Sequence, residues 1–345
     1  MKKHANIPIF IPHLGCPNQC VFCNQRTITG VEEFSPRDAE KIIEEALATI
    51  EDGVECEIAF FGGSFTGIDR TLMCELLKTA HSYVVNGRVM SIRCSTRPDY
   101  INQEILDILK RYGVKVIELG LQSARDYVLD VTKRGHTFKD EEIACRLIVD
   151  NGFTLVGQMM IGLPGSDEDS EEETARFIVS SGAKAARIYP TVVFKNTELY
   201  FMAETGLYKP LVESEAIERS ARVLKILRDG GVEVIRIGLC ASENLSDETT
   251  YYAGPNHPAL GELVENQYFY NKIKEKISRG ENAENKDIIV YVGCGSLSKA
   301  IGQKKTNRLR LISEYPSSHF FFKERADVAE YDVEVEFEER KKRCI

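Results

Sequence analysis

The sequence predicts an α/β protein: a partial or full TIM-like (β/α) barrel of parallel strands, followed by a small C-terminal α+β extension. Two observations support this fold class. Short segments rich in β-forming residues alternate with longer segments of helical period from residue 7 to about residue 239. Repeated β-α units give parallel sheets, and a long series of them favours a barrel over an open sheet. Active residues should then lie on the loops that follow the strands.

The individual elements have readable ends. Ser35, followed by a proline and an aspartate, suits a helix N-cap, and Asn102 suits another. Gly113, Gly152 and Gly182 suit helix C-terminal ends, because glycine readily adopts the left-handed conformation found there. The expected strands are residues 7–11, 56–61, 89–95, 114–121, 154–160, 185–194 and 232–239.

The alternation of strand and helix patterns ends at about Cys240, which marks a domain boundary. A Pro/Gly/His segment precedes a helical run that ends near Ile277, and a polar linker follows it. We therefore expect a barrel domain of residues 1–240 and an α+β extension of residues 241–345. The extension has short strand-like runs at residues 288–292, 309–312, 319–322 and 332–337.

Composition restricts the class of protein and its location. The chain of 345 residues is 43% hydrophobic and 28% charged, as expected of globular proteins. The N-terminus has no secretory signal pattern, and no apolar stretch approaches the ~20 residues that span a bilayer. We therefore expect a cytoplasmic protein with no membrane partner. The net charge of -9 disfavours a surface that is basic throughout, although one local run is strongly basic: Lys299, Lys304, Lys305, Arg308 and Arg310.

Three of the ten cysteines are clustered directly after the first expected strand. The segment GCPNQCVFC places Cys16, Cys20 and Cys23 within eight residues, which suits one cubane iron–sulfur cluster. Three cysteines leave one iron without a protein ligand, and an open position on a metal is where a small molecule chelates. The alternatives are a zinc site, which wants a fourth ligand and has only His13 nearby, or three unrelated thiols.

The cysteine motif and six further motifs resemble the radical S-adenosylmethionine superfamily, and in particular the radical domain of the Elongator catalytic subunit, a tRNA wobble-uridine modification enzyme. In chain order the matching motifs are CPNQCVFC, FFGGSFTG, STRPDYI, ELGLQS, KRGHT, MMIGLPG and IYPTVVFKNTELY. The resemblance does not include the acetyltransferase domain of that family, so acetyl-CoA chemistry is not expected. It implies a 4Fe–4S cluster that reductively cleaves S-adenosylmethionine to a 5′-deoxyadenosyl radical. A low-potential electron donor of ferredoxin or flavodoxin type would supply the electron.

The same resemblance assigns roles to individual residues. Arg134 is expected to pair with the methionyl carboxylate, which suits a planar guanidinium. Gly62 and Gly63 would let the main chain approach the methionyl amino group. The residues expected to contact S-adenosylmethionine are Phe22, Gly62, Gly63, Ser64, Gln122, Ser123, Arg134, Gln158 and Met160, and the catalytic candidates near the barrel mouth are Tyr189 and Lys195.

The sequence leaves three interpretations of the function open. An RNA similar to tRNA is favoured, and a tetrapyrrole or other small molecule, as in coproporphyrinogen oxidases, is the runner-up. The third reading is an iron–sulfur or RNA-binding module without turnover. A second cluster or a catalytic thiol at Cys240, Cys294 or Cys344 also stays open. The glycine motif, Arg134 and Gln122 favour an active enzyme.

Overall fold

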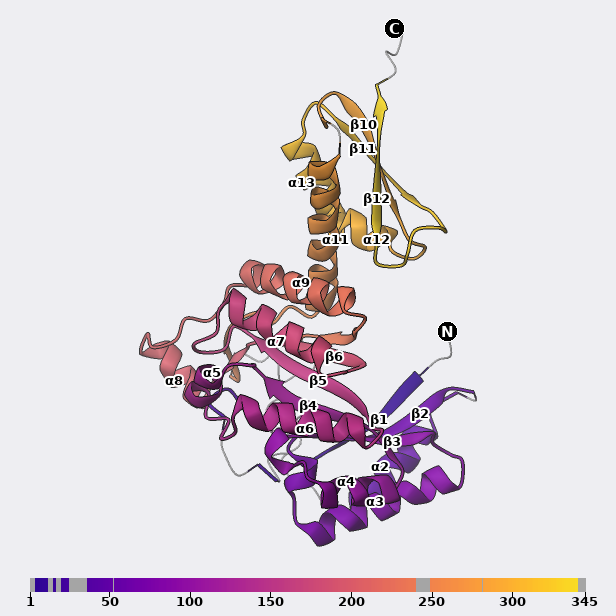
Figure 1. The fold of residues 1–345 in the computed structure, drawn as a ribbon, viewed down its shortest axis with the longest axis vertical. Helices are drawn as coiled ribbons and strands as arrows, with labels where there is room; N and C mark the ends of the chain where they lie inside the picture. Colours follow the sequence, from indigo (N-terminus) through magenta and orange to yellow (C-terminus); the bar gives the residue numbers. More distant parts are fainter. Residues whose placement is uncertain are drawn as a thin grey trace. The chain divides into compact units, whose positions relative to one another are not determined.

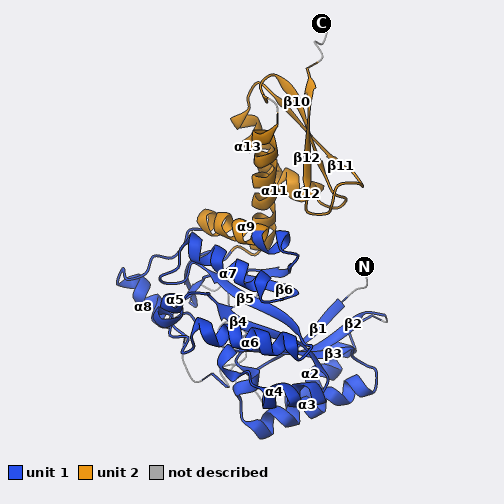
Figure 2. Cartoon of the chain, viewed as in Figure 1, with its two compact units in different colours: residues 1–212, 226–256 blue, residues 213–225, 257–345 orange. Residues whose placement is uncertain are grey.

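The computed structural model describes residues 4–11, 15–16, 20–24, 36–51, 53–239, 249–280 and 282–340. The chain divides into two compact units (Figure 2). The first comprises residues 1–212 and 226–256, and the second residues 213–225 and 257–345. Each unit is described by itself below. The assignment of a barrel domain to residues 1–240 and an extension to residues 241–345 stays a prediction.

The first unit is built on one sheet of parallel strands that forms a half-barrel (Figure 1). The strands follow the chain from one edge of the sheet to the other, in the order β1-β2-β3-β4-β5-β6-β8. The fold class predicted from the sequence is thus confirmed, in its partial-barrel form. The bounds are β1 His4–Phe10, β2 Glu55–Phe61, β3 Ser91–Thr96, β4 Val114–Gln122, β5 Thr154–Ile161, β6 Ala185–Pro190 and β8 Glu233–Ile237.

Helices connect successive strands of the half-barrel. Their ends follow the sequence signals: Asn102 Oδ1 accepts the backbone N–H of Ile105 at 3.0 Å. Gly113, Gly152 and Gly182 have φ of +80°, +81° and +81°. The predicted cap at Ser35 lies outside the described residues. The helices are α2 Pro36–Leu47, α3 Arg70–Val85, α4 Gln103–Arg111, α5 Asp126–Val131, α6 Phe138–Asp150, α7 Glu168–Ser180, α8 Glu198–Glu204 and α9 Glu213–Asp229.

One expected strand is wrong as a single element. Residues 185–194 form β6 and, after a break, the short strand β7 Val193–Phe194. Proline has no N–H to donate to a ladder, and β6 ends at Pro190. β7 then pairs antiparallel with β9 Tyr251–Ala253 in a separate sheet.

The second unit holds a three-stranded mixed sheet. β10 Lys286–Val292 lies in the centre, parallel to β11 His319–Glu324 and antiparallel to β12 Val333–Glu339. The strand expected at residues 309–312 is wrong, because these residues belong to a helix in which Asn307 and Leu311 are buried four residues apart on one face. The helices here are α11 Leu260–Arg279, α12 Leu297–Ile301 and α13 Thr306–Glu314. Among the described residues, no helix has both the length and the apolarity to cross a membrane.

A buried carboxylate links four strands of the half-barrel. Glu118 on β4 is fully buried. Its carboxylate accepts Arg93 Nη1 at 3.0 Å, Arg187 Nε at 2.7 Å and Gln158 Nε2 at 2.9 Å. Arg93 also donates through Nε to Glu57 Oε2 at 2.9 Å. The interior of the half-barrel is therefore crossed by a network of charged groups.

Because two buried guanidinium groups depend on Glu118, its charge should matter for stability. We predict that Glu118→Gln lowers the free energy of unfolding by about 3–5 kcal/mol, the usual cost of leaving buried charges without a partner. Urea unfolding followed by circular dichroism measures it. The matched control is Glu44→Gln, which removes an exposed carboxylate paired with Arg88 and should have little effect. Equal stability of the two variants would contradict this role for Glu118.

Candidate active site

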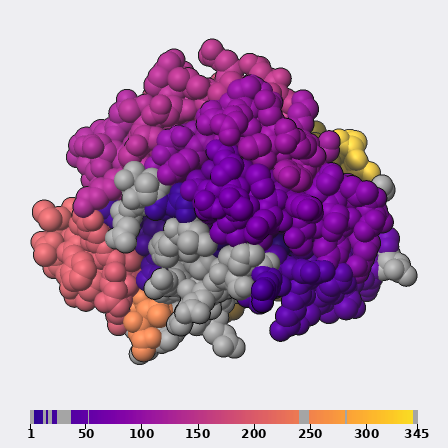
Figure 3. Space-filling model, turned by 90° about the horizontal axis from the view of Figure 1, so that it is seen from below, coloured from indigo at the N-terminus to yellow at the C-terminus, as the bar shows by residue number. Residues whose placement is uncertain are grey.

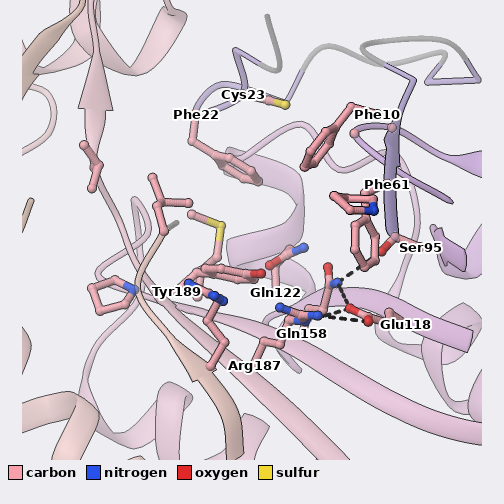
Figure 4. A pocket seen from close by; sticks show the side chains of 18 of the residues that line it. Phe10, Phe22, Cys23, Phe61, Ser95, Glu118, Gln122, Gln158, Arg187 and Tyr189 are labelled. Carbon is pink, nitrogen blue, oxygen red and sulfur yellow. Dashed lines mark hydrogen bonds and ion pairs between the residues drawn. The ribbon is translucent and has the colours of Figure 1, made fainter. Parts of the chain in front are cut away.

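A cavity of about 410 Å³ opens inside the first unit (Figure 4). Five aromatic residues line it: Phe10, Phe22, Phe61, Tyr189 and Phe194. In the close-up, Cys23 and Phe22 lie at one end, and the network of Glu118, Gln158 and Arg187 lies at the other, with Gln122 and Tyr189 between them. The remaining lining residues include Gly62, Gly63, Ser95, Met160 and Arg236. The cavity thus combines aromatic walls with a charged floor, which is formed by Glu118, Arg187 and Arg236.

The backbone of Gly15 and Cys16 packs directly against the segment that follows β2. Gly15 has φ of +75°, and a Cβ at this position would lie 2.2 Å from the carbonyl oxygen of Ser64. A Cβ at Gly67 would in turn lie 2.4 Å from the carbonyl oxygen of Gly15. Such close approach of two backbones requires glycine on both sides. The first cysteine is therefore positioned by the glycine-rich motif of residues 60–67.

The other two cysteines are held by a different part of the unit. The backbone N–H of Val21 donates to Thr132 O at 3.2 Å, and Val21 O accepts the N–H of Leu199, the second residue of α8, at 2.8 Å. The N–H of Cys23 donates to Cys20 O at 3.0 Å, which forms a turn. In Figure 3 the indigo N-terminal residues lie between the coral and the purple parts of the unit.

The three thiols lie beside different neighbours. Cys16 accepts a hydrogen bond from the backbone of Ser64, Cys20 Sγ lies 3.2 Å from Arg134 Nη1, and Cys23 lines the cavity. Burial raises the pKa of the Cys16 thiol, against the effect of that hydrogen bond and of the nearby arginines. Within the described residues, no group of three His, Cys, Asp or Glu side chains is gathered as a metal site.

Two buried arginines surround Cys20. Arg134 donates to Cys20 and, through Nη2, to Gly120 O at 2.5 Å. Arg97 Nη1 lies 4.0 Å from Cys20 Sγ, and its Nε donates to Asp99 at 2.9 Å. Both arginines are at most 5% exposed. Their positive charges favour thiolates and an anionic cluster at this position.

A neutral pair lies next to these arginines. His136 Nε2 lies 3.0 Å from Glu141 Oε1, and both side chains are buried. Burial, assisted by Arg134 and Arg97, lowers the pKa of His136 to about 3. Burial raises the pKa of Glu141 well above its usual value. Glu141 therefore does not cancel the positive charge of the arginines.

Two polar atoms near the cysteines have no hydrogen-bond partner among the described residues. These buried atoms are Gln122 Oε1 and Arg134 Nε. Unpaired buried polar atoms are costly and often mark a position where a ligand binds. One is an acceptor and the other a donor, so they match a ligand with both hydroxyl or amino groups and a carboxylate.

The residues predicted to bind S-adenosylmethionine fall into two groups. Those that line the cavity are Phe22, Gly62, Gly63, Gln122, Gln158 and Met160. Ser64, Ser123 and Arg134 are buried beside it and are not among the lining residues described. Ser64 Oγ, for example, lies 2.9 Å from Thr96 Oγ1.

Of the two catalytic candidates, one lines the cavity and the other does not. Tyr189 lines the cavity, whereas Lys195 is not among the described lining residues and its backbone N–H donates to Thr250 O at 2.8 Å. Cys294 is exposed, and Cys240 and Cys344 lie outside the described residues.

Sequence reasoning missed the charged floor. From the sequence, Glu118, Arg187 and Arg236 are predicted only to lie within strands. One signal in the sequence is that each is a charged residue flanked on both sides by apolar residues within an expected strand.

The donor set fits the cofactors that the cysteine motif implies. Cys23, Gly62 and Gln122 line the cavity, and Cys20 lies against the two guanidinium groups of Arg97 and Arg134. Gly62 has φ of +98°, and a Cβ would lie 3.0 Å from the backbone nitrogen of Ile11. An anionic cluster and a zwitterionic small molecule suit these groups.

Comparison with known proteins places the chain in a family. The model of the radical SAM superfamily matches residues 10–178, and that of the radical SAM C-terminal domain matches residues 183–269. An uncharacterized protein of Methanocaldococcus jannaschii is 31% identical over 229 residues, which cover 63% of this chain and 70% of that protein. The chain belongs to the radical SAM superfamily. It is therefore a radical SAM enzyme, and membership implies a 4Fe–4S cluster and S-adenosylmethionine, as the sequence predicted.

Relatives with named activities match over a shorter length. A tRNA uridine(34) acetyltransferase of M. jannaschii is 32% identical over 158 residues, which are 45% of this chain and 29% of that enzyme. The solved structure of archaeal Methanocaldococcus infernus Elp3 with an N-terminal deletion has a TM-score of 0.62 at 23% identity. The match covers 80% of this chain and 64% of that one. This chain thus spans less than a third of the first enzyme's length, and the structural likeness concerns the fold.

The contact at Gly15 predicts a specific defect. Gly15→Ala should prevent Cys16 from reaching its position, because the new Cβ would overlap the carbonyl of Ser64. We predict loss of most iron and sulfide after anaerobic reconstitution. The control is Gly152→Ala, which has nearly the same φ, +81°, but no atom within 4 Å of the added Cβ. Similar iron contents in the two variants would show that backbone strain alone, and not the contact, matters.

Proposed function

We propose that Cys16, Cys20 and Cys23 hold the cluster, that S-adenosylmethionine binds in the adjoining cavity, and that the enzyme modifies a nucleoside of an RNA similar to tRNA. One observation carries the proposal: Cys23 and the glycines of the FGGSF motif line the same cavity as Tyr189 and the charged floor. The position where the 5′-deoxyadenosyl radical forms and the reacting group of the substrate would then lie in the same cavity.

The chain's own residues bind and orient the cosubstrate. The main chain at Gly62 and Gly63 takes the methionyl amino group, and Arg134 takes the methionyl carboxylate through its unpaired Nε. Gln122 Oε1 accepts from a ribose hydroxyl. Met160 and Gln158 line the wall where adenine would lie. When bound, the cluster and S-adenosylmethionine together supply a 5′-deoxyadenosyl radical, with an electron from a ferredoxin- or flavodoxin-type donor.

The RNA substrate is supported by the walls of the cavity and by the relatives. Phe10, Phe22, Phe61 and Tyr189 offer aromatic faces on which an unstacked base can lie. Two proteins that match part of this chain are named for tRNA uridine(34) chemistry. Tyr189 is the residue we propose to position the target base, since it lies between the cysteine end and the floor.

A basic surface on the second unit supports an RNA partner independently. Of the five basic residues in the run, Lys299 and Arg310 lie over the rings of Tyr331 and Tyr270, at 5.3 and 3.6 Å. The other three are exposed and form no ion pair within the described part of the chain: Lys304, Lys305 and Arg308. We propose that these three contact phosphates.

The proposal predicts that release of 5′-deoxyadenosine depends on RNA. With dithionite and S-adenosylmethionine, the reconstituted enzyme should release it severalfold faster when unmodified tRNA is added, and ribonuclease treatment of the tRNA should remove the increase. Chromatography with mass spectrometry measures the product. Cys20→Ala should abolish release, and the half-buried Cys74→Ala should not. Release that tRNA never stimulates would refute an RNA substrate.

A further inference from the structure

Two arginines lie side by side at the floor of the cavity. Arg187 on β6 and Arg236 on β8 are register partners of neighbouring parallel strands, and both line the cavity. Neighbouring strands are about 4.8 Å apart, so the two Cα atoms are close. Two positive charges placed so closely repel each other unless each has a counter-charge.

Among the described residues, one of the two arginines has a counter-charge and the other does not. Arg187 donates through Nε and Nη2 to Glu118, at 2.7 and 3.0 Å. Arg236 has no hydrogen bond or ion pair with any described residue. The other charged groups of the interior are already paired: Arg93 bridges Glu57 and Glu118, and His4 lies 3.0 Å from Glu57.

Among the described residues that surround the floor, positive charge is therefore in excess: there are three guanidinium groups, those of Arg93, Arg187 and Arg236, and two carboxylates, those of Glu57 and Glu118. The surroundings of the cavity near Arg236 are partly apolar, with Val192 and Leu239 among its lining residues. In such surroundings a charge interacts more strongly than in water, and an anion would be bound well.

The methionyl end of S-adenosylmethionine is expected at the other side of the sheet. Gly62 and Gly63 directly follow β2, next to the first strand, whereas Arg236 lies on β8 at the opposite edge of the strand order. Arg134 already serves the methionyl carboxylate in the proposed function. Arg236 is thus left for a different ligand.

We propose that Arg236 binds the carboxylate or phosphate group of a small-molecule cosubstrate that occupies the floor of the cavity. A guanidinium fork matches two oxygens of either group. A cavity of about 410 Å³ accommodates a small molecule more readily than a continuous RNA backbone. The inference rests on the proposed function only in taking this cavity as the active site.

Anion binding can be measured without turnover. The thermal unfolding midpoint of the reconstituted protein is titrated with sodium phosphate and, separately, with sodium acetate, at ionic strength held constant with sodium chloride. We expect at least one anion to stabilise the wild-type protein. Arg236→Gln should weaken the apparent affinity about tenfold or more, the usual effect of losing a charge-assisted hydrogen bond. Arg236→Lys should recover only part of it, because lysine lacks the fork.

The control is Arg111→Gln, which removes an exposed arginine at the end of α4 and should leave the anion effect unchanged. A stronger effect of phosphate than of acetate would assign a phosphorylated cosubstrate, and the reverse a carboxylic acid. Identical anion responses of the wild-type, Arg236→Gln and Arg111→Gln proteins would overturn the proposal. So would an anion effect that S-adenosylmethionine competes away, because Arg236 would then bind the methionyl carboxylate. An Arg236-dependent effect without RNA-stimulated turnover would instead refute only the RNA substrate.

Discussion

The carboxylate of Glu118 is the interaction on which the cavity depends. A barrel of parallel strands is ordinarily filled by layers of branched apolar side chains. Here the middle of the half-barrel is crossed by Arg93, Gln158 and Arg187, which all bind this one buried carboxylate. Because the network ties β3, β4, β5 and β6 together through polar groups, the space beyond it need not be filled with apolar side chains. The charged floor and the open cavity thus have the same cause.

The cysteine end of the cavity obeys a second constraint. Cys16 is positioned by backbone contact through Gly15, whereas Cys20 and Cys23 are positioned through Val21 and its hydrogen bonds. The positive charge of Arg97 and Arg134 lies against Cys20, and the neutral His136–Glu141 pair does not cancel it. An electropositive, largely buried environment favours an anionic iron–sulfur cluster and raises its reduction potential relative to an apolar one. Charge and backbone geometry therefore act on the same three thiols.

The sequence predicted the parts of the protein that local patterns encode. Period-2 and period-3.6 segments gave the strands and helices, and Asn102 and Gly113 marked helix ends by their own side-chain chemistry. The cysteine motif gave the family, because the spacing of three thiols is specific to one kind of chemistry. Motif residues such as Gly62, Gln122 and Met160 do line the cavity.

What the sequence did not predict depends on long-range register. Glu118, Arg187 and Arg236 meet only because β4, β6 and β8 align in the folded sheet, and nothing local in each strand indicates the partner. The separate strand β7 depends on pairing with β9, about sixty residues later in the chain. The segment LRLI at residues 309–312 predicts a strand where the structure has a helix, because four residues are too few for their periodicity to distinguish the two.

The central claim is that the three cysteines hold a cluster whose open iron faces a cosubstrate bound in the adjoining cavity. Electron paramagnetic resonance of the reconstituted, dithionite-reduced protein tests it directly, with spectra recorded before and after addition of S-adenosylmethionine. We predict the signal of one reduced 4Fe–4S cluster per chain, whose g values shift when S-adenosylmethionine is added. A protein that yields no such signal, or one whose spectrum S-adenosylmethionine leaves unchanged, would contradict the account.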